Sequence, residues 1–162
     1  MVMDVIEKLI AGHREVREEI DILDKLVKMS NSDAFAWDDV FKISDFFEKE
    51  VKEHFRLEEM VLFPVMKNVL PLSEQNILTE IEDEHKPILG KLDDFKKMAE
   101  RHKKISSKNS REDFVNSAKA IIDSLIPHAK KEDVKLFPLV RKYFKTENYK
   151  ELEEMYFKYL KV

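Results

Sequence analysis

The sequence predicts an all-α protein, an up-down-up-down four-helix bundle with an additional short C-terminal helix. Three observations lead to this fold. The 162 residues include only two glycines, whereas sheet proteins need glycines in their tight turns. Lys, Glu, Leu, Ile and Met, which favour helices, are abundant. Apolar residues recur at spacings of three and four over four long stretches, as on the buried face of an amphipathic helix.

Four long helices are expected, joined by short polar connections. Their apolar stripes cover residues 2–27, 40–65, 78–99 and 114–139. The stretches between them have compositions typical of turns and helix N-caps: SNSD (30–33), LPLS (70–73) and ISSKNS (105–110). A fifth, shorter helix is expected after Thr146, a suitable N-cap. One side of it carries Tyr149, Leu152, Met155, Tyr156 and Tyr159.

We therefore expect a bundle domain at residues 1–145 and a C-terminal helix at residues 146–162. The bundle divides into two pseudo-repeats, about 1–72 and 73–145. The aromatic side of the last helix is expected to pack on the bundle or cap it. A protein partner bound through this helix is the alternative.

Composition excludes several classes of protein. The formal net charge of −4 offers no basic patch for nucleic acid. The chain has no cysteine, so it forms no disulfide and holds no thiolate or iron–sulfur site. No apolar run approaches the ~18–20 residues of a membrane span, and the acidic start MVMDVIEKL is unlike a signal peptide. We expect a cytoplasmic protein that does not enter a membrane.

A repeated motif carries the functional signal. HFRLEEMVLFP begins at His54, and HAKKEDVKLFP begins 74 positions later at His128. Both place a glutamate four residues after the histidine, at Glu58 and Glu132. Residues one helical turn apart lie on the same face. The Leu-Phe-Pro that follows each pair is interpreted as core packing before a proline kink.

Four of the five histidines lie in the apolar stripes, one on each long helix: His13, His54, His85 and His128. Residues of neighbouring antiparallel helices are level when they are equidistant from the connection. The midpoints of successive histidines fall at 33.5, 69.5 and 106.5, beside the three predicted connections. The four histidines should therefore form one layer, with the two glutamates a turn away.

Such a layer predicts a dinuclear transition-metal site held by His13, His54, Glu58, His85, His128 and Glu132. Imidazole nitrogens suit iron, zinc, copper or nickel, and bridging carboxylates suit paired metals of the iron and manganese type. Two octahedral irons would keep about two positions open for O2, NO, peroxide, azide or water. No residue stands out as a general acid or base. His102, near the end of the third helix, is expected to be a solvated cation, with a metal role as the alternative.

These residues resemble the hemerythrin-like (HHE cation-binding) domain over about residues 1 to 145. The resemblance rests on His13, His54-x-x-x-Glu58, His85 and His128-x-x-x-Glu132, with Leu-Phe-Pro after each pair. It implies a four-helix bundle holding two iron ions with an oxo or hydroxo bridge. The carboxylates of Glu58 and Glu132 would bridge the irons, and the ligand would be a small diatomic or peroxide.

The chain departs from the oxygen-carrying members at two positions. They have a further histidine four residues after the one on the third helix, where this chain has Leu89. Their fourth-helix carboxylate lies five residues after its histidine, which makes Asp133 an alternative to Glu132. The ligand set is more similar to the branch with iron-cluster repair and nitric-oxide-responsive proteins. Its members often carry a cysteine-containing segment that is missing here.

Two other functions stay open. A ferritin-like di-iron oxidase or peroxidase would use mainly glutamates with Glu-x-x-His pairs, and the His-x-x-x-Glu order argues against it. A metal-free helical interaction module would bind a partner through its last helix. Mutation of His54 or His128 would then barely change metal content or spectra.

Overall fold

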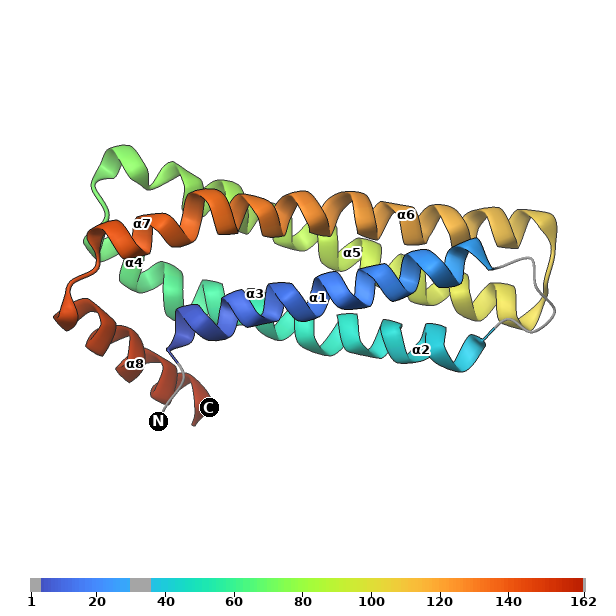
Figure 1. Cartoon of the computed structure of the whole chain (residues 1–162), viewed down its shortest axis with the longest axis horizontal. Helices are drawn as coiled ribbons and strands as arrows, with labels where there is room; N and C mark the ends of the chain where they lie inside the picture. Colours follow the sequence, from blue (N-terminus) through green and yellow to red (C-terminus); the bar gives the residue numbers. More distant parts are fainter. Residues whose placement is uncertain (1–3, 30–35, 162) are drawn as a thin grey trace.

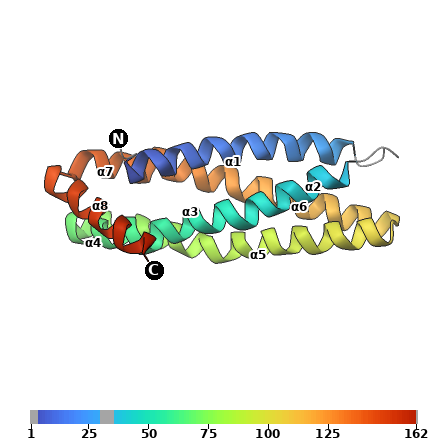
Figure 2. The same ribbon diagram turned by 90° about the horizontal axis from the view of Figure 1, so that it is seen from below.

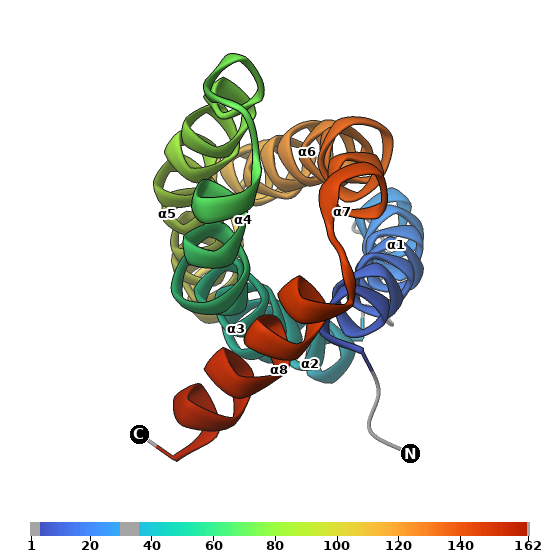
Figure 3. The same ribbon diagram turned by 90° about the vertical axis from the view of Figure 1, so that its left-hand side faces the viewer.

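The protein is an all-α bundle, described by a computed structural model over residues 4–29 and 36–161. Four helical rods run side by side, and a shorter helix crosses one end (Figures 1 and 3). The first rod is α1 (Val5–Lys28) and the third is α5 (Asn76–Lys104). The second rod comprises α2 (Trp37–Phe46), η1 (Phe47–Val51), α3 (Lys52–Leu57), η2 (Glu58–Leu62) and α4 (Phe63–Val69). The fourth comprises α6 (Lys108–Lys131), η4 (Glu132–Leu136) and α7 (Phe137–Tyr143), and α8 (Thr146–Leu160) follows.

The predicted fold class is thereby confirmed, and no strand occurs in the described part of the chain. The connection at 70–73 contains extended Leu70 and a short 3-10 helix, η3 (Leu72–Glu74). The connection at 105–110 ends at Ser107, whose side chain caps α6 by accepting a hydrogen bond from the N–H of Ser110. The predicted SNSD connection lies outside the described residues.

Apolar side chains fill the bundle on both sides of the histidine layer. One cluster, which includes fully buried Phe47, Phe95 and Phe114, joins the four rods beyond the layer. The other, with Leu62, Phe63 and Leu152, lies at the end that α8 covers. Close packing of this kind holds side chains in fixed rotamers. The two clusters therefore form a rigid frame on either side of the polar layer.

The π-helical segments η2 and η4 begin at the two glutamates of the repeated motif, Glu58 and Glu132. A π turn inserts one extra residue into a helix, and such turns are frequent at functional sites. A proline follows each segment, at the second position of α4 and of α7, and proline has no N–H to donate. The Leu-Phe-Pro sequence thus marks a π segment within a continuous rod.

Helix α8 lies against one end of the bundle (Figure 2). Its side chains Tyr149, Leu152, Met155, Tyr156 and Tyr159 belong to the apolar cluster at that end or pack against it. Leu152 is 1% exposed. The hydroxyl of Tyr159 donates a 2.6 Å hydrogen bond to Glu53, and Nζ of Lys8 donates one of 2.8 Å to the hydroxyl of Tyr156. These bonds tie α8 to both α3 and α1.

The expectation for His102 was wrong. Its ring is 7% exposed and lies between Trp37 and Phe114, with ring centroids at 5.4 and 5.9 Å. Its Nδ1 lies 2.7 Å from Oγ of Ser110. Burial lowers the pKa of His102, because desolvation disfavours the charged imidazolium. His102 is therefore part of the far end of the core.

None of the described helices combines the length and the apolar character needed to cross a membrane.

Candidate metal centre

The structure brings the six predicted ligand residues together in one layer across the bundle. His13 comes from α1, His85 from α5 and His128 from α6, and each is 2–3% exposed. His54 comes from α3, and its side chain is 11% exposed. Glu58 and Glu132 are fully buried at the starts of η2 and η4. Burial of two carboxylates requires compensating positive charge.

The layer divides into two histidine pairs on either side of the glutamates. His13 and His54 approach to 3.1 Å between their Nε2 atoms. The rings of His85 and His128 lie 5.2 Å apart between centroids. The donor atoms form two groups, and within each group they all lie within 4.8 Å of one another. One group comprises His13, His54 and Glu132, and the other comprises Glu58, His85, His128 and Glu132. Glu132 belongs to both groups.

Each glutamate directs its two oxygens towards different histidine pairs. In Glu58, Oε2 lies 3.6 Å from Nε2 of His54, and Oε1 lies 3.1 Å from Nε2 of His85. In Glu132, Oε1 lies 2.7 Å from Nε2 of His13, and Oε2 lies 2.8 Å from Nε2 of His128. This is the arrangement by which a carboxylate can span two adjacent cations.

Several of these buried atoms lack a hydrogen bond within the described residues. They are Oε1 and Oε2 of Glu58, Nδ1 and Nε2 of His85, Nε2 of His128 and Oε2 of Glu132. Their partners lie at short distances but outside hydrogen-bond geometry. Buried polar atoms without partners are rare because each costs about 1–3 kcal/mol. Converging lone pairs of imidazole and carboxylate fit a bound metal cation.

Carboxylates outside the layer contact the outer nitrogens of three histidines. Nδ1 of His13 lies 2.8 Å from Asp133, and Nδ1 of His128 lies 2.9 Å from Glu84. Glu59 lies 3.4 Å from Nδ1 of His85, without hydrogen-bond geometry. A carboxylate at Nδ1 fixes the tautomer in which Nε2 is free to bind metal.

The sequence pattern did not single out Glu84 or Glu59, and Asp133 was expected only as an alternative ligand. Each of the three is next to a predicted ligand in the chain, which is the one sequence feature that could have indicated them. Two basic residues hold the acids in place: Arg17 pairs with Asp133, and Lys131 pairs with Glu84.

Aromatic rings pack against the histidines of the layer. Phe55 stacks on His85 with ring centroids 3.9 Å apart. The phenylalanines of the two Leu-Phe-Pro sequences also lie near ligand candidates, with Phe137 5.5 Å from His13 and Phe63 6.4 Å from His85. These contacts restrict ring rotation and exclude water from the layer.

The charges of the layer are strongly interdependent. Burial, together with the negative charge of Glu132, raises the pKa of Glu58 well above its usual range. Burial acts in the same direction on Glu132, but hydrogen bonds from the surrounding histidines lower its pKa well below the usual range. Burial and the nearby His128 lower the pKa of His85 to about 4. A metal cation would favour ionised glutamates and neutral histidines together.

A small apolar cavity of about 20 Å³ adjoins the layer on the side of Phe55. His13, His54 and His128 line it with Val16, Val51, Phe55, Leu125 and Ala129. A cavity needs about 10–15 Å³ to hold one water molecule. The space is thus large enough for one water-sized molecule.

An all-α bundle with buried histidines and carboxylates converging between its helices defines a cation-binding helical protein. The family model for the hemerythrin HHE cation binding domain matches residues 4–140, and the chain belongs to this family. Neither the curated proteins nor the solved structures gave a match.

Proposed function

We propose that the layer holds two iron ions and that the protein binds or reacts with O2, NO or peroxide there. One iron would be held by His13 and His54, the other by His85 and His128. Glu58 and Glu132 would bridge them. The observation that carries this assignment is the division of each glutamate's two oxygens between the two histidine pairs.

The donor set supports iron. Imidazole nitrogen combined with bridging carboxylate suits paired metals of the iron and manganese type, whereas zinc sites favour four tetrahedral ligands, often including thiolate. The two glutamates neutralise two of the four charges of an Fe(II) pair, so a hydroxo or oxo bridge would improve the balance. Asp133 supports the assignment as a positioning residue, since it contacts Nδ1 of His13.

The role of the chain is to position the metals and restrict access to them. Bound iron would supply the redox chemistry and the open coordination positions. The ligand would occupy the small apolar cavity that His13, His54 and His128 line. Phe55, Phe63 and Phe137 would exclude water. We propose a sensing, stress-response or iron-handling role, in the cytoplasm.

The proposal includes a division of the chain into a bundle and a C-terminal cap. The bundle would comprise residues 1–145 in two pseudo-repeats, and α8 would act as a cap. A protein partner at α8 would have to use its outer side, where Phe157 and Leu160 are 42% and 56% exposed.

The first experiment is metal analysis of anaerobically purified protein, with absorption spectra before and after addition of O2 or NO. About two irons per chain, with new charge-transfer bands on ligand addition, are expected from the donor set. The decay rate of these bands separates a carrier from a reactive site. A chain that takes up no iron on reconstitution, with an unchanged melting temperature, would contradict the proposal in favour of a metal-free module.

A further inference from the structure

The histidines of the two halves of the bundle correspond in pairs, but the residue beside one member of a pair differs. His85 lies 72 positions after His13, and His128 lies 74 positions after His54. The same offset of 72 pairs Glu84 with Gly12. Glu84 lies 2.9 Å from Nδ1 of His128 and pairs with Lys131. Within the described residues, no ion-pair or hydrogen-bond partner faces Nδ1 of His54, and Gly12 stands beside it.

Gly12 leaves space that another residue would fill. A Cβ atom at position 12 would lie 3.1 Å from Nδ1 of His54, tighter than ordinary contact. The other glycine, Gly90, has nothing within 4 Å of such an atom. Glycine in a helix interior destabilises the helix relative to alanine. At position 12 the backbone of α1 passes so close to the ring of His54 that a larger residue would press against it.

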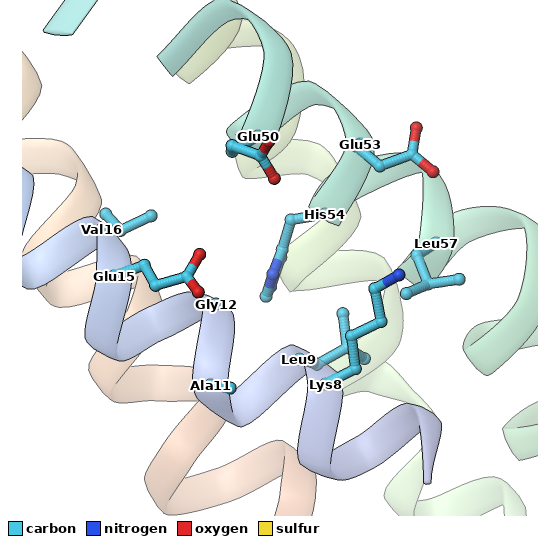
Figure 4. Close-up of a pocket in the computed structure, with 10 residues that line it drawn as sticks. All are labelled: Lys8, Leu9, Ala11, Gly12, Glu15, Val16, Glu50, Glu53, His54 and Leu57. Carbon is cyan, nitrogen blue, oxygen red and sulfur yellow. The ribbon is translucent and has the colours of Figure 1, made fainter. Parts of the chain in front are cut away.

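A surface cavity of about 260 Å³ opens between α1 and α3 at this point (Figure 4). Gly12, Val16 and His54 line it, and Figure 4 shows the His54 ring between the two helices. The corresponding groove between α5 and α6 is lined by Glu84, Ile88 and Lys131. His128 is not among the described residues that line this groove. The ion pair of Glu84 and Lys131 lies beside its ring instead.

The cavity between α1 and α3 and the small cavity beside the layer share a wall. Val16 and His54 line both of them. A metal held by His54 would fix that ring, and Val16, which is 8% exposed and belongs to the apolar core, is the other side chain that separates the two cavities. A small molecule in the groove is therefore one valine side chain away from the layer.

The rim of the groove is acidic. Glu15, Glu50 and Glu53 line it together with a single cation, Lys8. Helix α8 holds two of these groups in place through the Lys8–Tyr156 and Glu53–Tyr159 hydrogen bonds. A negative rim repels anions and leaves uncharged molecules unaffected.

We propose that the groove between α1 and α3 is the entrance by which an uncharged small ligand reaches the layer, with Gly12 keeping it open and Val16 standing between the groove and the layer. The proposal rests on the proposed function, since the ligand is the one that the iron pair would bind. An entrance changes the rates of binding and release equally and leaves affinity unchanged. A residue that contacts bound ligand changes affinity.

The test compares Val16→Phe with Ile88→Phe, the corresponding position in the other groove, using NO on the Fe(II) form. Val16→Phe should slow association and dissociation by the same factor, about tenfold, which equals ~1.4 kcal/mol in barrier. Ile88→Phe should leave both rates within about twofold of the parent, below ~0.4 kcal/mol. Equal effects of the two variants, or an affinity change without a rate change, would overturn the entrance.

Parent protein that binds two irons but neither binds nor reacts with NO, O2 or peroxide would overturn the proposed function and the entrance with it. If the parent binds NO and the Val16→Phe variant binds it at the same rates, the entrance alone would be overturned. Azide tests the acidic rim on the Fe(III) form. Substitution of Glu15 and Glu50 by glutamine should speed azide association at low ionic strength and leave NO association unchanged. Identical responses of azide and NO would argue against passage through this rim.

A second readout needs no metal. Gly12→Ala and Gly90→Ala make the same chemical change in two helices. Gly90→Ala should raise the melting temperature of the metal-free protein, because alanine favours the helix at an open position. Gly12→Ala should give no increase, because its methyl group meets His54. Equal increases would show that position 12 is not close to His54 and would contradict the geometry of the entrance.

Discussion

Glu132 and Asp133 contact opposite nitrogens of the same imidazole. Oε1 of Glu132 lies 2.7 Å from Nε2 of His13, and Oδ1 of Asp133 lies 2.8 Å from Nδ1. Glu132 is fully buried, whereas the Asp133 side chain is 29% exposed and pairs with Arg17. Adjacent helical residues point about 100° apart, so only one of them faces the layer. The geometry gives the inner position to Glu132.

This arrangement predicts different effects for the two acids. Glu132→Gln should lose most of the bound iron, because Glu132 would bridge both metals. Asp133→Asn should retain two irons per chain but weaken their affinity about 10–100-fold, as expected for a partner that only orients a ligand. Iron per chain and competition with a chelator measure both quantities. Complete iron loss in Asp133→Asn with retention in Glu132→Gln would reverse the assignment.

The layer of four histidines could be foreseen because helix geometry is periodic and the connections are short. Equal distances from a connection place His54 and His85 at one height, and i, i+4 spacing places Glu58 beside His54. Neither step depends on details of packing. The structure brings together all six predicted residues for this reason.

Other features depend on tertiary contacts that a one-dimensional pattern does not contain. The contact between Glu84 and His128 joins two helices, so the position of Glu84 next to His85 in the chain does not reveal which ring it contacts. His102 was wrongly expected in solvent because its neighbours in sequence are charged, whereas Trp37 and Phe114 cover it in the fold. The π segments were not foreseen because proline alone also fits a simple kink.

Metal binding should stabilise the fold. Without a cation, the layer holds two buried carboxylates whose lone pairs lack full hydrogen bonding. A ligand that binds only the folded state stabilises it by about 4 kcal/mol at a concentration 1,000-fold above its dissociation constant. The melting temperature of the parent should therefore rise with added Fe(II) under anaerobic conditions, as calorimetry can measure.

The matched control for this measurement is His85→Ala, which removes one predicted ligand. Its melting temperature should respond little to Fe(II). An equal rise in the parent and in His85→Ala would place the stabilising metal elsewhere on the chain.

His102 should make stability depend on pH. Burial lowers its pKa in the folded state below the ordinary value of 6.5. Above about pH 6.5 the ring is neutral in both states and has no effect. As the pH falls below that value, the unfolded state takes up the proton first, so the free energy of unfolding decreases. The decrease ends once the pH is below the folded pKa.

His102→Gln should remove this part of the pH dependence while lowering stability at neutral pH through lost ring contacts. Urea unfolding of metal-free protein at about pH 7.5 and about pH 5.5, followed by fluorescence of the single tryptophan, gives both free energies. Titration of the other histidines is common to the parent and the variant, so their difference isolates His102. An equal loss of stability on acidification in both proteins would show that His102 is not buried in its neutral form.

Helix α8 should contribute to bundle stability through Leu152. This side chain is 1% exposed and belongs to the same apolar cluster as Leu62 and Phe63. Leu152→Ala should lower the free energy of unfolding by about 2–5 kcal/mol, because it removes buried methyl groups and leaves a cavity. Leu160→Ala, on the same helix but 56% exposed, should change it by less than about 0.5 kcal/mol. Chemical denaturation of both variants measures the difference, and a small effect at Leu152 would mean that α8 is detached from the bundle in solution.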